Sequence, residues 1–163
     1  MNPYAHRILS LLEDRDPLAI LSETPQRLET LAPALSRRAG QSYAPGKWTA
    51  LKLMCHLADA ETSMAFRLRQ IVAGVEVIQP WDQDVWAKPY SKLSLTLAMS
   101  TFLAVRAWNL AWLEALDGAE WQRSYTHPER GPETFEIALR LLAGHDLNHL
   151  RQLEQIAAQS TGK

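Results

Sequence analysis

The sequence of 163 residues predicts an all-α fold, a four-helix bundle formed by a single domain over residues 1–163. Apolar residues recur with the helical period along four long segments, whereas the alternation typical of β-strands is scarce. Hydrophobic residues make up 47% of the chain, enough to form a core between packed helices. Several helices without convincing strands favour a bundle, here with long connections between helices 2 and 3 and between helices 3 and 4.

The first helix is expected at about residues 25–38. It follows an apolar-rich opening at residues 4–21, which is interrupted by the run Asp14-Arg15-Asp16-Pro17. Pro25 suits a first helical turn, because the N–H that it lacks would have no partner there. Pro33 falls inside the segment and therefore predicts a kink or a shorter helix.

The other three helices are expected at residues 49–73, 94–116 and 134–159. Thr49 is a good N-cap for the second helix, and Gly74 is a typical residue at its end. The connections at residues 75–93 and 118–133 are long for a minimal bundle. Because long loops in compact domains often carry function, both are candidate walls of a site.

Composition and charge exclude several classes of function. The net charge is −1, which argues against a nucleic-acid partner because such partners leave a basic footprint. No apolar run is long enough to span a membrane, and the N-terminus does not resemble a signal peptide. The single cysteine, Cys55, fits a reducing compartment, so we expect a cytoplasmic protein in which Cys55 is a small core side chain.

His145 and His149 are the strongest chemical signal in the sequence. Their i, i+4 spacing on the expected fourth helix places both imidazoles on one face, where both can reach one metal ion. Neighbours one turn away include Leu141, Leu142 and Leu153, so the pair lies on the buried stripe. A buried polar group without a partner costs about 1–3 kcal/mol, and one ion would satisfy both rings. The alternative is a pair of core histidines bonded to nearby carbonyl groups.

His56 is a candidate third ligand on the expected second helix. Its neighbours on the same face are Leu53, Ala60 and Met64, again a core-facing surface. Three histidines from two inward faces can hold an ion and leave coordination positions open, as catalytic zinc sites do. Asp59 could accept a hydrogen bond from His56. For the neighbouring carboxylates a solvated surface position is the simpler interpretation, and these are Asp59, Glu61, Asp146 and Glu154.

Other polar and aromatic residues carry weaker signals. We interpret His6 as a surface residue, and His127 either as an ordinary loop histidine or as a lid over the site. Arg106 could reach an anionic substrate, although a surface or salt-bridged position is the simpler interpretation. The tryptophans fall into two sets: Trp108 and Trp112 are core candidates, whereas Trp81 and Trp86 belong to an irregular loop that either covers a ligand or packs under the bundle.

Three blocks of the sequence resemble the DinB-like (YfiT-type) superfamily. They cover roughly residues 40–160 in the family's order: Trp48-Thr49 with His56–Glu61, the acidic-aromatic loop Pro80–Ala87, and His127–Gly131 with Gly144–Gln152. The resemblance implies a four-helix bundle, usually a homodimer. It also implies a divalent ion, zinc or nickel, held by His56, His145 and His149.

The resemblance further implies an enzyme acting on a small molecule, preferably a transferase that attaches a low-molecular-weight thiol to an electrophile. A hydrolase that uses metal-bound water is the alternative, because an ion with open positions can activate either water or a thiol. A non-catalytic bundle that binds a metal or ligand also remains open. The sequence assigns no catalytic residue, since either nucleophile would come from solution.

Overall fold

The computed structural model describes residues 3–159, and four long helices dominate it. These are α2 (Pro17–Arg37), α3 (Ala50–Val72), α5 (Leu95–Glu114) and α6 (Phe135–Ala157). The shorter elements are α1 (Pro3–Ser10), α4 (Gln83–Trp86), η1 (Tyr90–Lys92), η2 (Gly118–Gln122), β1 (Ser124–His127) and β2 (Gly131–Thr134). The predicted four-helix bundle is confirmed.

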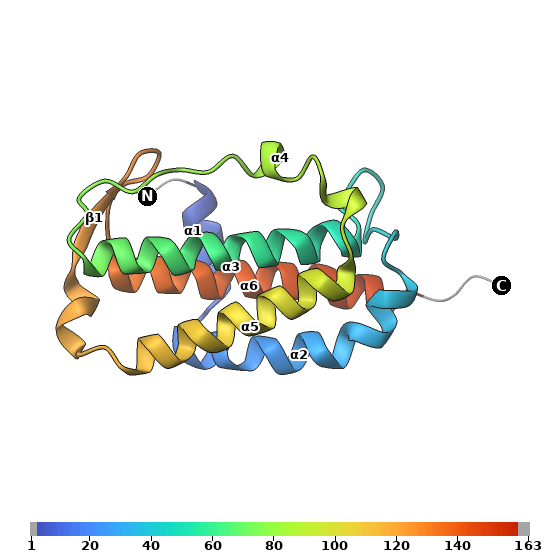
Figure 1. The fold of residues 1–163 in the computed structure, drawn as a ribbon, viewed down its shortest axis with the longest axis horizontal. Coiled ribbons are helices and arrows are strands. Elements are labelled where there is room, and N and C mark those ends of the chain that lie inside the picture. Colours follow the sequence, from blue (N-terminus) through green and yellow to red (C-terminus); the bar gives the residue numbers. More distant parts are fainter. Residues whose placement is uncertain (1–2, 160–163) are drawn as a thin grey trace.

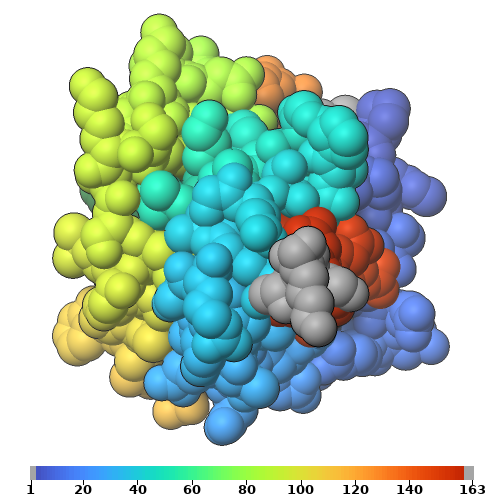
Figure 2. Space-filling view, turned by 90° about the vertical axis from the view of Figure 1, so that its right-hand side faces the viewer, coloured from blue at the N-terminus to red at the C-terminus, as the bar shows by residue number. Residues whose placement is uncertain are grey.

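The four long helices lie side by side, with α2 packed on α6 and α5, and α3 packed on α5 and α6. Helices α3 and α5 run in the same direction, so the segment between them must return along the whole length of the bundle (Figure 1). The connection between α2 and α3 covers the opposite end of the bundle from the β-strands (Figures 1 and 2). The long connection that carries α4 thereby forms an outer wall beside α3.

The predicted start of the first long helix is wrong. Asp16 caps α2 by accepting from the Ala19 N–H at 3.1 Å, and Pro17 occupies the first turn. Pro25 and Pro33 both lie inside this helix. Proline at position 25 lacks the N–H that would bond to the Leu21 carbonyl, and that carbonyl instead accepts from Arg106 at 2.9 Å. A tertiary donor thus replaces a helical one, which sequence spacing could not reveal.

The other helix starts follow the sequence closely. Thr49, Ser94 and Thr134 each cap a long helix by accepting a backbone N–H three residues on. Gly74, with φ of +83°, lies just beyond the end of α3, as predicted. Good capping residues therefore locate three of the four helix starts, because a side-chain oxygen there satisfies an N–H that has no helical partner.

The predicted loop at residues 118–133 contains a β-hairpin. Strands β1 and β2 pair antiparallel, from Ser124 opposite Thr134 to His127 opposite Gly131. Gly131 adopts φ of +85°, the conformation that glycine allows at low cost in a tight turn. Each strand has only four residues, too short for a recognisable alternation, so the sequence-based assignment as loop was wrong.

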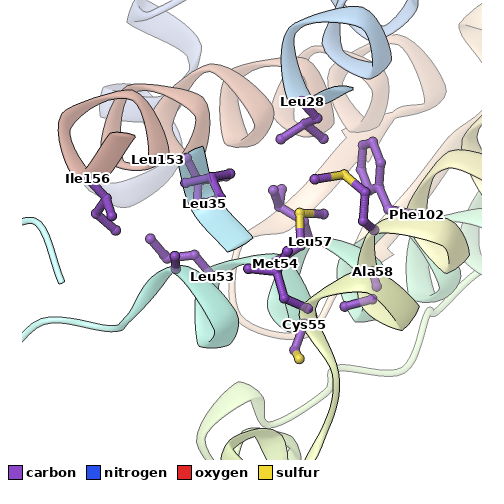
Figure 3. Close-up of a cluster of buried hydrophobic side chains, with 14 of the residues drawn as sticks. Leu28, Leu35, Leu53, Met54, Cys55, Leu57, Ala58, Phe102, Leu153 and Ile156 are labelled. Carbon is purple, nitrogen blue, oxygen red and sulfur yellow. The ribbon is translucent and has the colours of Figure 1, made fainter. Parts of the chain in front are cut away.

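Two apolar clusters fill the interior of the bundle. One joins all four long helices toward the α2–α3 connection, and Figure 3 labels ten of its residues: Leu28, Leu35, Leu53, Met54, Cys55, Leu57, Ala58, Phe102, Leu153 and Ile156. The other centres on Phe135, Leu139 and Leu142 of α6 near the hairpin. Cys55 is 3% exposed, which confirms it as a core side chain.

Helix α1 lies against α6 at a point where only glycine fits. A Cβ built on Gly144 would come within 2.3 Å of the Ile8 carbonyl oxygen and 2.7 Å of the Ile8 side chain. Ile8 and Leu12 are almost fully buried at this contact. Gly144 immediately precedes His145, so α1 closes the back of the helix that carries two of the candidate ligands.

Some surface features differ from expectation. Trp108 is 66% exposed on α5, so its assignment to the core was wrong. Phe66 and Leu97 are also exposed, at 64% and 62%. Within residues 3–159, none of the helices combines the length and the apolar character needed to cross a membrane.

Candidate metal centre

Three histidines from two helices converge inside the bundle. His56 projects from α3, and His145 and His149 project from α6. Each ring offers one nitrogen, and these three atoms lie within 4.8 Å of one another. The ring centroids of His56 lie 4.9 Å from those of both other histidines, and the His145 and His149 centroids are 4.4 Å apart. The structure therefore brings together all three predicted ligands.

The surroundings of the three rings favour the neutral imidazole. Burial, assisted by the nearby His149, lowers the pKa of His56 to about 3. Burial lowers the pKa of His149 to about 4, although its hydrogen bond to Gln152 acts in the opposite direction. Burial and the two neighbouring histidines hold the pKa of His145 well below its usual value. A neutral imidazole has a free lone pair, which is the form that binds a metal ion.

Hydrogen bonding fixes one of the rings and leaves the other two incompletely satisfied. His149 Nδ1 lies 2.8 Å from Gln152 Oε1, and the Gln152 amide donates in turn to the Tyr43 hydroxyl at 3.3 Å. The Nε2 atoms of His56 and His145 face each other at 2.9 Å. Their Nδ1 atoms are buried and lack partners within residues 3–159. A hydrogen bond between two of the rings cannot satisfy the third, whereas one ion can accept a lone pair from all three.

Two tryptophans enclose His56. Trp81, from the long connection before α4, stacks on the ring with centroids 5.6 Å apart and planes inclined by 26°. Trp48 approaches edge-on at 5.1 Å, and Trp86 packs against Trp81 at 4.8 Å. Trp81 thus covers the ring of a candidate metal ligand, and the expectation that the tryptophan loop either covers a bound ligand or packs under the bundle stays a prediction.

A cavity of about 600 Å³ opens beside the histidines. His56 and His145 reach its wall together with Trp81, and its apolar lining includes Met64 and Leu142. Such a volume is typical of a small-molecule site with a mainly apolar lining and a few polar groups. Within the described chain, no further His, Cys, Asp or Glu side chain joins the three histidines. The coordination positions that three histidines would leave free on a bound ion can therefore face this cavity.

A buried ionic network lies next to the histidines. Arg106 of α5 donates to Glu61 of α3 and to Asp146 of α6, each at 2.7 Å, and all three side chains are at most 1% exposed. Asn109 also donates to Glu61 at 2.7 Å. Burial works to lower the pKa of Arg106, but Asp146 and Glu61 raise it above its usual value. Asp146 adjoins His145, so the network ties together the two helices that carry the ligands.

This network was not predicted from the sequence. A solvated position was expected for Glu61 and for Asp146, and both are buried instead. The salt-bridged alternative for Arg106 is correct, although its partners were not identified. The available signal was the nearness of Glu61 and Asp146 in sequence to the candidate ligands on α3 and α6. Asp146 lies one residue from His145 and Glu61 five from His56, but spacing alone does not show which carboxylate finds a buried cation.

The remaining candidates take varied positions. His6 is exposed, as predicted. Asp59 does not contact His56 and instead accepts a hydrogen bond from the Tyr90 hydroxyl, so its suggested supporting role was wrong. His127 is only 3% exposed on β1 and lines the cavity with Arg130, whose side chain lies 2.9 Å from its Nε2. Burial and then Arg130 lower the pKa of His127.

A four-helix bundle with an inward histidine triad beside an apolar cavity defines the class of protein to which this chain belongs. Its residues 20–153 match the family model of the DinB superfamily, most of the chain. The protein is a member of the DinB superfamily. The predicted family resemblance is thereby confirmed.

Individual relatives support the same assignment. A protein from Oceanobacillus iheyensis is 27% identical over 117 residues, which are 71% of this chain and 68% of that protein. YfiT from Bacillus subtilis is 25% identical over 148 residues, 86% of this chain and 82% of YfiT. The names of both propose a metal-dependent hydrolase. The solved structure of YfiT, described as an unusual four-helix bundle, superposes with a TM-score of 0.79 at 21% identity over 86% of this chain and 83% of YfiT.

The donor set of this chain fits a divalent metal ion. Three imidazole nitrogens suit zinc, nickel and related ions, which prefer nitrogen over purely oxygen ligands. The Gln152 oxygen beside His149 Nδ1 is the kind of outer acceptor that orients a ligating ring. The Nε2 atoms of His56 and His145 face each other at 2.9 Å, so one ion between the rings can accept a lone pair from each of them.

Proposed function

We propose that this protein is a metal-dependent enzyme that acts on a small molecule, with a divalent ion held by His56, His145 and His149. The observation that carries the proposal is the convergence of three neutral imidazoles, two of which, His56 and His145, reach the wall of a 600 Å³ cavity. Zinc and nickel are among the ions that imidazole ligands suit, and we propose one of these two. When bound, such an ion supplies Lewis acidity, which lowers the pKa of a thiol or a water molecule that reaches it.

The preferred reaction is transfer of a low-molecular-weight thiol to an electrophile. The cavity is larger than a water molecule requires, and its apolar lining leaves room for a cosubstrate beside the histidines. Hydrolysis is the second candidate, because the names of the relatives from Oceanobacillus iheyensis and Bacillus subtilis propose a metal-dependent hydrolase. Both reactions use the same three histidines and differ in the nucleophile that enters from solution.

The protein side chains around the cavity have distinct roles in this proposal. Trp81 covers the His56 ring and limits the access of water to that side. Gln152 holds the His149 ring by accepting from its Nδ1–H, which leaves Nε2 for the ion. Met64 and Leu142 form part of an apolar wall of the cavity. Because this wall lowers the local polarity, electrostatic interactions within the cavity are stronger.

We also propose that the single domain forms a homodimer through the face of α5. This helix is apolar around most of its circumference, with exposed Leu97 and Trp108, and Phe66 is exposed on the adjacent α3. Large apolar side chains on one surface favour association with a partner. Sedimentation at micromolar concentration should give the mass of two chains for the wild type. The Trp108→Glu variant should give the mass of one chain.

Metal content tests the centre directly. Protein purified without chelators should contain about one zinc or nickel ion per chain, and the triple replacement of His56, His145 and His149 by alanine should contain none. Cobalt substitution should give visible absorption bands whose intensity reports the coordination number. Equal metal content in the wild type and the triple variant would refute the proposal.

A nucleophile panel separates the two candidate reactions. The metal-loaded protein is incubated with an electrophile such as monochlorobimane, with and without L-cysteine, and with p-nitrophenyl acetate as an ester. Thiol transfer predicts thiol-dependent conjugation above the uncatalysed rate, and loss of that excess in the triple histidine variant. Ester hydrolysis without thiol, and no enhanced conjugation, would favour the hydrolase instead.

A further inference from the structure

The cavity wall carries a buried cation at a distance from the histidines. Arg67 of α3 lines the same cavity as His56 but is only 8% exposed. Its guanidinium donates to the Gln79 carbonyl at 2.7 Å, and none of the ion pairs found among residues 3–159 includes it. A guanidinium offers five N–H donors. Among residues 3–159, no carboxylate lies within ion-pair distance of those of Arg67.

The neighbouring charges leave this cation uncompensated. Arg130 also lines the cavity, but its side chain makes a two-pronged ion pair with Glu133, at 2.6 and 2.9 Å. Glu133 additionally accepts from the Tyr125 hydroxyl, so this carboxylate is fully engaged. Burial and then Arg130 lower the pKa of Arg67, as expected for a cation beside another cation. The charges of Arg67, Arg130 and Glu133 therefore sum to one positive charge.

Two further carboxylates line the cavity and reduce this charge only weakly. Glu129 and Asp82 are both exposed, and neither lies within ion-pair distance of Arg67. Exposed charges are screened by water and salt, whereas a buried cation is screened much less. The Asp82 carboxylate is also engaged in capping α4, where it accepts from the Asp84 and Val85 N–H groups.

The spacing of residues along α3 places His56 and Arg67 on one face of the helix. His56, Ala60, Met64 and Arg67 all line the cavity. Positions 56 and 67 are about three helical turns apart, so both side chains leave the same face, separated by roughly 16 Å of helix axis. Ala60 and Met64 form an apolar floor between the two polar ends. A ligand that fits this floor has an apolar body, a reactive end near the histidines and an anionic end near Arg67.

We propose that Arg67 is a specificity-determining residue that binds a carboxylate carried by the substrate. A guanidinium matches a carboxylate with two parallel hydrogen bonds, and one negative charge balances the single uncompensated cation. This assignment rests on the proposed function only in taking the cavity as the substrate site. It assigns the substrate class as a small, partly apolar monocarboxylate, and Arg67 acts by binding it rather than by taking part in bond making.

A matched pair of ligands tests the charge preference. The probes are 4-phenylbutyrate and its neutral amide, 4-phenylbutyramide, titrated calorimetrically into the metal-loaded protein at low salt. The wild type should bind the carboxylate at least about tenfold more tightly than the amide, a difference of about 1.4 kcal/mol. Replacing Arg67 by Met should remove this preference while leaving the amide affinity within about twofold. A wild type without the preference, or a Met variant that keeps it, overturns the assignment.

Three controls make the outcome specific. Arg151→Met removes an exposed arginine of α6 that does not line the cavity, and it should change neither affinity. Arg67→Lys keeps the charge and should retain part of the preference. If the Met variant loses both ligands through collapse of the cavity, the folded Lys variant decides. Absence of any carboxylate preference in that variant then overturns the proposal.

Removal of the metal separates this proposal from the proposed function. After chelation, the carboxylate preference should persist within about twofold, because it depends on Arg67. If chelation abolishes the preference and Arg67→Met does not, the carboxylate binds the ion and the assignment to Arg67 fails. If the triple histidine variant keeps the wild-type metal content while the Arg67 preference persists, the metal-centre proposal fails and the anion site stands.

Discussion

Two polar regions lie side by side inside the bundle, and they are built in opposite ways. The histidine triad consists of neutral rings that the protein satisfies incompletely, with His56 and His145 reaching a cavity. The network of Arg106, Glu61 and Asp146 consists of opposite charges that pair with one another in a nearly water-free interior, although Arg106 Nε and Asp146 Oδ1 have no hydrogen-bond partner among residues 3–159. The first region is thus suited to receive an external partner, whereas the second is closed and holds three helices together.

The two regions depend on the same helices. Helix α3 carries His56 and Glu61, and α6 carries His145 and Asp146. Through Arg106, helix α5 therefore fixes the relative positions of both helices that supply the candidate ligands. A buried ion pair of this kind adds little net stability compared with an apolar replacement, but removing one partner leaves a charge without compensation. The network is best understood as a device for positioning the triad.

The largest expected effect comes from breaking the closed region. Replacing Arg106 by Met leaves Glu61 and Asp146 buried without their cation, which should lower the free energy of unfolding by about 3–5 kcal/mol. It also removes the donor to the Leu21 carbonyl that Pro25 leaves free in α2. Urea denaturation measures the change. The matched control is Arg27→Met, which breaks the partly exposed pair with Glu154 and should cost less than about 1 kcal/mol.

A triple variant sharpens this test. Combining Arg106→Met with Glu61→Gln and Asp146→Asn removes all three charges and should recover part of the lost stability, since two uncompensated carboxylates are then absent. If the free energy of unfolding of the single Arg106 variant lies within about 1 kcal/mol of that of the wild type, the network is not a closed electrostatic unit.

The second prediction concerns the histidine triad. His145→Ala should lose the metal and, in metal-replete buffer, melt at a lower temperature than the wild type. Binding to the native state adds about 2.7 kcal/mol at a free metal concentration one hundred times the dissociation constant. After chelation, both proteins should melt at similar temperatures, because apolar burial maintains the bundle. The control is His6→Ala, which replaces an exposed histidine and should behave as the wild type.

Two outcomes of this experiment would change the interpretation. Full metal occupancy in His145→Ala would show that His145 is not a ligand. A wild type that unfolds when the metal is removed would show that the ion braces the bundle, and the enzymatic proposal would weaken.

The open region was far more predictable from sequence than the closed one. The i, i+4 spacing of His145 and His149 on an apolar stripe predicted that both rings point inward from one helix. His56 likewise lies on the apolar face of a second helix. Arg106 pairs with residues 45 and 40 positions away in the chain, and no local periodicity encodes such a pairing. Periodicity likewise failed for Trp108, which has an apolar side chain but faces outward.

Helix ends show the same division between local and distant causes. Thr49, Ser94 and Thr134 cap helices through hydrogen bonds three residues away, so local sequence locates them. The α2 helix continues through Pro25 because a distant arginine satisfies the freed carbonyl. The hairpin at residues 124–134 was missed because four-residue strands offer too short a pattern. A structural feature can therefore be predicted from sequence where residues of one helix or loop determine it. It cannot be predicted in this way where it depends on contacts between distant elements.

The third prediction concerns the wall behind the triad. Gly144→Ala forces a Cβ to within 2.3 Å of the Ile8 carbonyl, so α1 must move away from α6. Overpacking of this kind costs about 1–3 kcal/mol, to be measured by thermal unfolding of the metal-free protein. Gly118→Ala is the control, because a Cβ there meets nothing within 4 Å. An unchanged melting temperature for Gly144→Ala would show that α1 is not firmly seated beside His145.

The smallest expected effect on folding comes from Gln152, and it separates binding from structure most cleanly. Gln152→Ala removes the acceptor for His149 Nδ1 and the link to Tyr43. Loss of such an outer partner typically lowers metal affinity by about 10–100-fold, because the ligand ring is no longer held in its binding orientation. The metal-free variant should unfold within about 1 kcal/mol of the metal-free wild type, since Gln152 is only partly buried.

Competition with a chromophoric chelator measures the affinity, and Gln122→Ala, at an exposed position outside the centre, is the control. If Gln152→Ala binds metal as tightly as this control, His149 is oriented by packing alone or does not bind the ion. Replacement by Glu provides the complementary arm, because a carboxylate retains an acceptor for Nδ1 and should restore most of the affinity. An affinity lost in the alanine variant and recovered in the glutamate variant assigns the effect to the hydrogen bond and not to the volume of the side chain.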